Sequence, residues 1–106
     1  MKVCVCSEGP DLESEVAEDI GHSPYFLVVE TDDMGFEAVE NEAAQWDMGA
    51  GMKAADIIID LGVEAVICDM IGPHGYSKLT EAGITVSSDE EGPVREAIAS
   101  FLRRRQ

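Results

Sequence analysis

The chain has 106 residues, of which 45% are hydrophobic, and this is enough for one hydrophobic core but not for two. Twenty-two acidic and seven basic side chains give a formal net charge of −15, which repels nucleic acids and anionic membrane surfaces. We therefore expect a single domain over residues 1–106, with no nucleic-acid or membrane partner.

The N-terminal residues predict a cytoplasmic protein. Met1-Lys2 leads directly into a strand-like run, and no run of eighteen apolar residues occurs, so we expect neither a signal peptide nor a spanning helix. The three cysteines are an odd number, and strand alternation places Cys4 and Cys6 on one face. Reduced thiols are therefore expected rather than a disulfide framework.

The first half of the chain predicts three neighbouring strands without crossover helices. Residues 2–6 are typical of a buried strand, and residues 7–24 form a long acidic loop in which a turn of helix is expected at residues 12–17. Residues 25–30 and 36–40 flank a turn-forming segment, Thr31 to Gly35, and this pattern predicts an antiparallel hairpin.

The second half alternates helices and strands. An apolar stripe predicts a helix that follows Gly49-Ala50-Gly51 and ends at Gly62, and later helices are expected from Gly72-Pro73 to residue 82 and from Pro93 to residue 102. Residues 63–68 and 84–86 read as strands between these helices. The sum is an α/β fold with a mixed five-stranded sheet: an antiparallel first half, a βαβαβα-type parallel second half, and helices on the faces.

Two glycine-containing helix entrances are candidate anion sites. Gly49-Ala50-Gly51 and Gly72-Pro73-His74 each place backbone N–H groups at the positive end of a helix dipole, and the second follows a strand end, where ligands gather in open α/β sheets. The phosphate-loop pattern is absent. The alternative is that these glycines only permit a tight entry into each helix.

A soft transition metal is a second possibility. His22 and His74 lie in predicted loops, and with Cys6 or Cys68 at strand ends they would form a mixed nitrogen and sulfur site. The alternative is solvated histidines and cysteines that pack as small hydrophobes. Trp46 and the methionines at 34, 48, 52 and 70 are scattered, which favours core and loop packing over a metal set.

Several separated features together resemble a known family. They are Ser7-Glu8-Gly9, Leu12-Glu13-Ser14-Glu15-Val16, Gly21-His22-Ser23-Pro24-Tyr25-Phe26, Gly49-Ala50-Gly51-Met52-Lys53-Ala54-Ala55 and Ile71-Gly72-Pro73. Their order and spacing resemble the dinitrogenase iron-molybdenum cofactor biosynthesis family, which includes nitrogenase cofactor carriers. The resemblance implies a ribonuclease H-like motif. It also implies a non-enzymatic role in binding or carrying an iron-molybdenum, molybdenum/copper or iron-sulfur cluster.

The resemblance also implies where a cluster would bind and what would exchange it. The expected contacts are Gly21, His22 and Ser23, the turn of Gly49, Ala50 and Gly51, and the turn of Gly72, Pro73 and His74. The expected partners are proteins that donate or accept the cluster, and the expected state is a monomer or weak homodimer. Members of the family commonly have Phe-Gly-Arg where this chain has Ile20-Gly21-His22, so a titratable group replaces a permanent cation.

Three functional hypotheses follow. The leading one is a small binding or carrier protein for a metal-sulfur cluster. The second is an interaction module that binds no ligand and regulates a redox or cluster-assembly partner. The third is a metal-dependent hydrolase in which Glu8 and Asp69 hold a divalent ion, although the charge of −15 disfavours a phosphodiester substrate.

Overall fold

The computed structural model describes residues 1–105 and contains five strands and three helices. The strands are β1 (Lys2–Ser7), β2 (Tyr25–Glu30), β3 (Gly35–Glu40), β4 (Ala65–Ile67) and β5 (Thr85–Ser87), and the helices are α1 (Ala50–Asp60), α2 (Pro73–Glu81) and α3 (Val94–Arg104). The strands form one sheet in the order β3-β2-β1-β4-β5. This mixed order, antiparallel on one side of β1 and parallel on the other, is the predicted ribonuclease H-like arrangement.

The predicted hairpin is confirmed. β1 pairs antiparallel with β2, from Lys2 opposite Glu30 to Ser7 opposite Tyr25, and β2 pairs in turn with β3. The connecting turn places Met34 at a positive φ of 62°, and the Asp33 carboxylate accepts a hydrogen bond of 2.8 Å from the Gly35 N–H. This side-chain acceptor is the usual reason for aspartate in tight turns.

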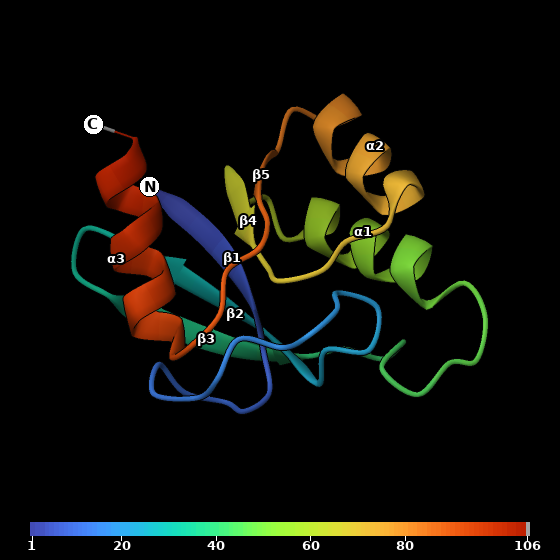
Figure 1. The fold of residues 1–106 in the computed structure, drawn as a ribbon, viewed down its shortest axis with the longest axis horizontal. Helices are drawn as coiled ribbons and strands as arrows, with labels where there is room; N and C mark the ends of the chain where they lie inside the picture. Colours follow the sequence, from blue (N-terminus) through green and yellow to red (C-terminus); the bar gives the residue numbers. More distant parts are fainter. Residues whose placement is uncertain (106) are drawn as a thin grey trace.

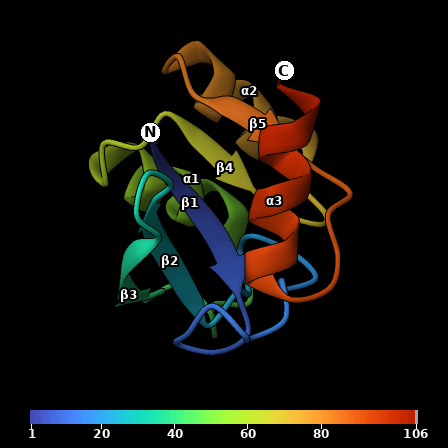
Figure 2. The ribbon, with the colours of Figure 1, turned by 90° about the vertical axis from the view of Figure 1, so that its left-hand side faces the viewer.

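Helices cover the two faces of the sheet, as Figures 1 and 2 show. α1 and α2 pack on one face, where Cys4, Cys6 and Cys68 join a core cluster with residues such as Ile58 and Leu79. α3 packs on the opposite face through Val94, Ala97, Ile98 and Phe101. Because side chains alternate along β1, that strand contributes to both clusters.

The expected turn of helix at residues 12–17 is wrong. Instead, Val16 forms an isolated bridge with Ser7, and Glu15 forms one with Pro93. The Ala17 N–H donates to the Cys6 carbonyl over 2.9 Å, and the Val16 N–H donates to the Gly92 carbonyl over 2.9 Å. Backbone groups of this loop therefore bond to distant segments, and these tertiary contacts override the local helical pattern.

Two loops meet at the carboxyl ends of β1 and β4. The Met70 N–H donates a hydrogen bond of 2.8 Å to the Glu18 carbonyl, and Asp19 forms a parallel bridge with Met70. The loop after β1 is thereby fixed beside the loop that leads into α2 (Figure 1). Within residues 1–105, no helix has the length and apolar character needed to cross a membrane.

Candidate functional site

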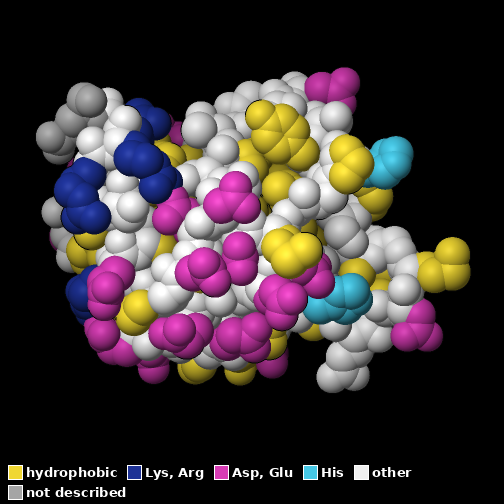
Figure 3. Space-filling view, viewed as in Figure 1, with side chains coloured by type: hydrophobic (Ala, Val, Ile, Leu, Met, Phe, Trp, Pro, Cys, Tyr) yellow, Lys and Arg dark blue, Asp and Glu magenta, His cyan; other side chains and the backbone are white. Residues whose placement is uncertain are grey.

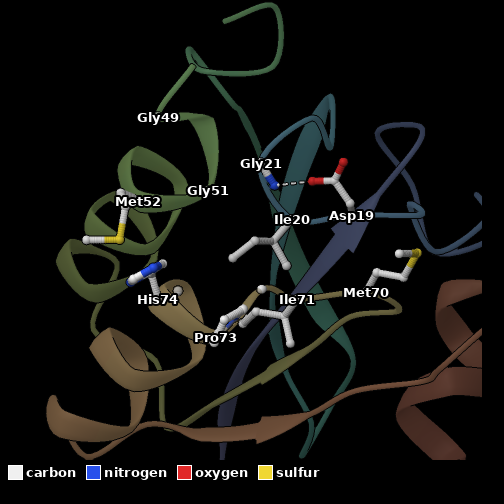
Figure 4. Close-up of a pocket in the computed structure, with 12 residues that line it drawn as sticks. Asp19, Ile20, Gly21, Gly49, Gly51, Met52, Met70, Ile71, Pro73 and His74 are labelled. Carbon is white, nitrogen blue, oxygen red and sulfur yellow. Dashed lines mark hydrogen bonds between the residues drawn. The ribbon is translucent and has the colours of Figure 1, made fainter. Parts of the chain in front are cut away.

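A cleft of about 480 Å³ lies where these loops meet the first turns of α1 and α2. Figure 4 shows that the 19–21 loop, the start of α1 and the start of α2 surround it. The lining residues are Asp19, Ile20, Gly21, Gly49, Gly51, Met52, Met70, Ile71, Gly72, Pro73, His74 and Gly75. The cleft thus brings together three loop segments that the sequence indicated separately, with apolar side chains and exposed backbone between them.

The N-termini of α1 and α2 leave backbone donors unpaired at this cleft. Neither helix has a side-chain cap. Within residues 1–105, no acceptor bonds to the N–H groups of Ala50, Gly51, Met52, His74 and Gly75. Ala50 and Gly75 are buried residues. Unpaired donors at a partly buried helix end carry a free-energy cost unless water or a ligand satisfies them, so the cleft suits a hydrogen-bond acceptor.

The third helix has a different N-terminus. In α3, the Val94 N–H donates to the Ser14 carbonyl over 2.8 Å and the Arg95 N–H donates to the Leu12 carbonyl over 2.9 Å. α3 also carries an acidic residue, Glu96, in its first turn, whereas α1 and α2 carry none there. Acidic residues favour the positive end of a helix dipole, yet this acidic chain places none in either first turn at the cleft. The positive ends of both helix dipoles at the cleft therefore have no acidic side chain of their own first turn beside them.

The glycines that line the cleft are glycine for different physical reasons. A Cβ added to Gly49, Gly51 or Gly72 would meet no atom within 4 Å. Gly49 has a positive φ of 77°, which explains its identity by backbone conformation. Gly51 lies in the first turn of α1 with no such conformation and no close neighbour, so neither strain nor packing requires glycine there. A missing side chain at Gly51 keeps the cleft wall open.

Gly21 has a structural role instead. A Cβ at Gly21 would lie 2.8 Å from the Gly51 nitrogen and 3.0 Å from the Ala50 carbonyl carbon. Only glycine therefore allows the 19–24 loop to approach the start of α1 this closely.

Asn41 holds the same loop, and the sequence analysis did not identify this role. Its buried side-chain amide donates to the Gly21 carbonyl over 3.0 Å and to the Ser23 carbonyl over 2.9 Å. Its amide oxygen accepts a hydrogen bond of 3.0 Å from the Ala43 N–H. Ser23 is fully buried, and its hydroxyl donates to the Tyr25 carbonyl over 2.7 Å, so it supports the loop and does not line the cleft. The only sequence signal for Asn41 was its place directly after a strand.

His22 lies outside the cleft, against Asp19 and the loop before α1. Its Nδ1 is 2.9 Å from the Asp19 carboxylate and its Nε2 is 3.1 Å from the Trp46 carbonyl. Both partners are acceptors, so this geometry favours the doubly protonated imidazole. The pKa of His22 is raised, chiefly by the Asp19 hydrogen bond and then by the Trp46 carbonyl.

Asp19 in turn organises the loop. Its carboxylate accepts hydrogen bonds from the Gly21 N–H over 2.7 Å and from the His22 N–H over 3.2 Å. Partial burial raises the pKa of Asp19, but hydrogen bonds from His22 and Gly21 outweigh this effect and lower it below its usual value. The Asp19 carboxylate beside the cleft therefore faces the His22 ring, which balances its charge when protonated.

The structure does not gather the four residues considered as metal ligands. Cys6 and Cys68 are fully buried in the core, His22 is engaged as described, and only His74 lines the cleft. Burial raises the pKa of Cys68 to about 12 and that of Cys6 well above its usual value, which disfavours the ligating thiolate. Across residues 1–105, no three side chains of histidine, cysteine, aspartate or glutamate are grouped to hold a metal ion.

Met34 packs against the core cluster under α3 as expected, whereas the other three methionines considered are exposed. Met48, Met52 and Met70 are 86%, 41% and 56% exposed, and Met52 and Met70 line the cleft. Their isolated positions in the sequence gave no periodic signal that would have grouped them. Glu8 and Asp69 line a neighbouring acidic hollow rather than the cleft itself.

Comparisons with known proteins extend this description. The orange protein of Desulfovibrio gigas, solved in its apo form, matches with a TM-score of 0.91 and 34% identity, over 97% of this chain and 88% of that one. The NMR structure of a Thermotoga protein described as a NifB protein of the DUF35 family matches with a TM-score of 0.81 and 34% identity, over 98% of this chain and 89% of that one. An uncharacterised Methanocaldococcus jannaschii protein is 30% identical over 92 residues, covering 84% of this chain and 78% of its own length. The family model named dinitrogenase iron-molybdenum cofactor matches residues 1–104, and the chain therefore belongs to this family.

Proposed function

We propose that this protein binds an anionic metal-sulfur cluster as cargo in the cleft between α1 and α2 and carries it between proteins of cluster assembly. The observation that carries the proposal is a set of backbone N–H groups at two helix N-termini that have no acceptor within residues 1–105. Four of the five belong to residues that line the cleft, namely Gly51, Met52, His74 and Gly75. Membership in the dinitrogenase iron-molybdenum cofactor family supports cargo of this class.

The cleft favours a soft, diffuse anion over a small hard one. Its donors are backbone amides, while Ile20, Ile71 and the thioethers of Met52 and Met70 supply apolar, polarisable contacts. The Lys53 ammonium in α1 is paired with the Glu42 carboxylate over 3.1 Å, so this cation is engaged outside the cleft. Hydrogen bonds to sulfur and apolar contacts would supply most of the binding, with at most one ligand from the protein, which suits a cargo that must be released.

Of the four residues considered as metal ligands, His74 is the one that lines the cleft, and Figure 4 places it next to Met52 at the start of α2. A role for His74 as a single ligand to the cargo is part of this proposal. The buried cysteines are not part of it, because their raised pKa values keep them protonated. The hydrolase hypothesis gains no support, since within residues 1–105 Glu8 and Asp69 belong to no group of three metal-ligating side chains.

The test is anaerobic reconstitution with iron and sulfide, with tetrathiomolybdate, and with tetrathiomolybdate plus copper, followed by metal analysis and a visible spectrum. Wild type should retain a stoichiometric chromophore after gel filtration. His74→Ala should weaken retention, because it removes the proposed ligand. The control is Ser77→Ala, which alters an exposed residue of α2 that does not line the cleft. Failure of wild type to retain any of these species would contradict the carrier function and favour the interaction module without a ligand.

A further inference from the structure

The mouth of the cleft continues into a second hollow with a different character. This hollow, of about 450 Å³, is lined mainly by the carboxylates of Glu8, Glu15, Glu18, Asp69 and Glu91, and Met70 lines both hollows. Figure 3 shows acidic side chains gathered on this face of the molecule beside hydrophobic ones. An apolar opening and a negatively charged surface are therefore continuous through Met70.

These carboxylates are not used by the fold. None of the five forms an ion pair or accepts a side-chain hydrogen bond within residues 1–105. Other acidic residues are paired: Glu13 with Arg95, Asp19 with His22 and Glu90 with Arg104. Five unpaired like charges around one hollow repel one another, so this arrangement costs free energy in the isolated protein.

Exposed apolar side chains accompany the charges. Met70, which lines both hollows, is 56% exposed, and Met52, which lines the cleft, is 41% exposed. Flexible methionines are common anchors in protein interfaces, and the charges around them favour a partner of opposite charge.

We propose that this acidic and apolar surface is the docking site for a protein partner whose lysine and arginine side chains surround an apolar protrusion. The inference rests on the proposed function, because a partner seated here covers the mouth of the cleft and is placed to give or take the cargo directly. A second copy of this chain does not fit, since its own matching surface carries the same charges. The charge complementarity assigns a basic partner.

The test uses cargo-free protein and a fluorescent synthetic peptide in which lysine and arginine flank leucine and tryptophan. The variant Glu15→Gln/Glu18→Gln/Glu91→Gln should bind the peptide about tenfold more weakly than wild type. Each of the three exposed carboxylates contributes a modest binding energy, and the loss of all three adds up to this change. The control Glu37→Gln/Glu40→Gln/Glu81→Gln removes the same charge from exposed positions elsewhere and should change affinity less than about twofold. Met70→Gln should weaken binding about threefold or more through lost apolar contact.

Two results would overturn the docking surface. The first is an equal loss of peptide affinity in both triple variants, which indicates attraction to the net charge alone. The second is self-association of the protein through this face in sedimentation. Amide shifts in NMR spectra should identify residues 8, 15, 18, 69, 70 and 91 as the contact. Because no cargo is present, the outcome is separate from that of reconstitution. Peptide binding here without cargo uptake would support the docking site and refute the carrier function. Cargo uptake without peptide binding would support the carrier function and refute the docking site.

Discussion

Replacing Gly51 with alanine should raise the stability of the fold and weaken cargo binding. The added Cβ meets no atom within 4 Å, and Gly51 lies in helical backbone in the first turn of α1. A glycine-to-alanine change at a compatible position stabilises a protein by about 0.4–1 kcal/mol, which corresponds to a rise in Tm of roughly 2–8 °C in a domain of this size.

The same methyl group would project from the wall of the cleft that Gly51 lines. It would keep a cluster away from the amides of the first turn of α1, so we expect at least about tenfold weaker binding, the equivalent of two hydrogen bonds of typical net strength. Thermal unfolding by circular dichroism gives the first quantity. An anaerobic titration with tetrathiomolybdate, followed by visible absorption, gives the second.

Gly21→Ala is the matched contrast. Its Cβ would lie 2.8 Å from the Gly51 nitrogen, so this variant should lose about 1–3 kcal/mol of stability. If Gly51→Ala were destabilised to a similar extent, the distinction between an open and a packed glycine would be wrong. If Gly51→Ala bound tetrathiomolybdate as tightly as wild type, the cleft would not be the cargo site.

Three further predictions concern the support of the site. Asn41→Ala leaves the buried Gly21 and Ser23 carbonyls without their donor and should cost about 2–4 kcal/mol in urea denaturation; an unchanged midpoint would contradict the role of Asn41 in holding the loop. The raised pKa of His22 means that its pairing with Asp19 stabilises the fold fully below its usual pKa near 6.5 and that this contribution is lost as pH rises through the folded-state value. NMR titration of the ring should show the raised pKa, and Asp19→Asn should return it toward 6.5, whereas no change in that variant would refute the pairing. Cys4, Cys6 and Cys68 are buried and their pKa values are raised, so the folded protein at pH 8 should resist alkylation of its thiols. The unfolded protein should be alkylated at all three thiols. Rapid alkylation of the folded protein would contradict this burial.

Most of the fold could be predicted from the sequence because its elements have strong local signals. α3 shows apolar residues at helical spacing behind Pro93, and the hairpin between β2 and β3 has turn residues between two β-branched and aromatic runs. The prediction of a helical turn at residues 12–17 was wrong because the backbone of this loop forms hydrogen bonds to β1 and to the segment before α3, and such distant contacts leave no local pattern.

The candidate site was predictable in its backbone and not in its side chains. Glycines before two helices indicated an anion site, and the structure places Gly49, Gly51 and Gly72 around one cleft. The metal set was a weaker inference, since sequence position does not show that Cys6 and Cys68 point into the core or that His22 is engaged by Asp19. Met52 and Met70 lie far apart along the chain and come to line one cleft only through the packing of loops on the sheet.

The most direct test of the central claim is an amide NMR titration of the isotope-labelled protein with tetrathiomolybdate under anaerobic conditions. We expect saturable shifts concentrated at the amides of Ala50, Gly51, Met52, His74 and Gly75, because these N–H groups have no acceptor within residues 1–105. The amides of Val94 and Arg95, which are bonded to carbonyls of the loop after β1, should remain unperturbed. Absence of saturable shifts at the first turns of α1 and α2, or shifts centred on another part of the molecule, would contradict the claim that this cleft holds the cargo.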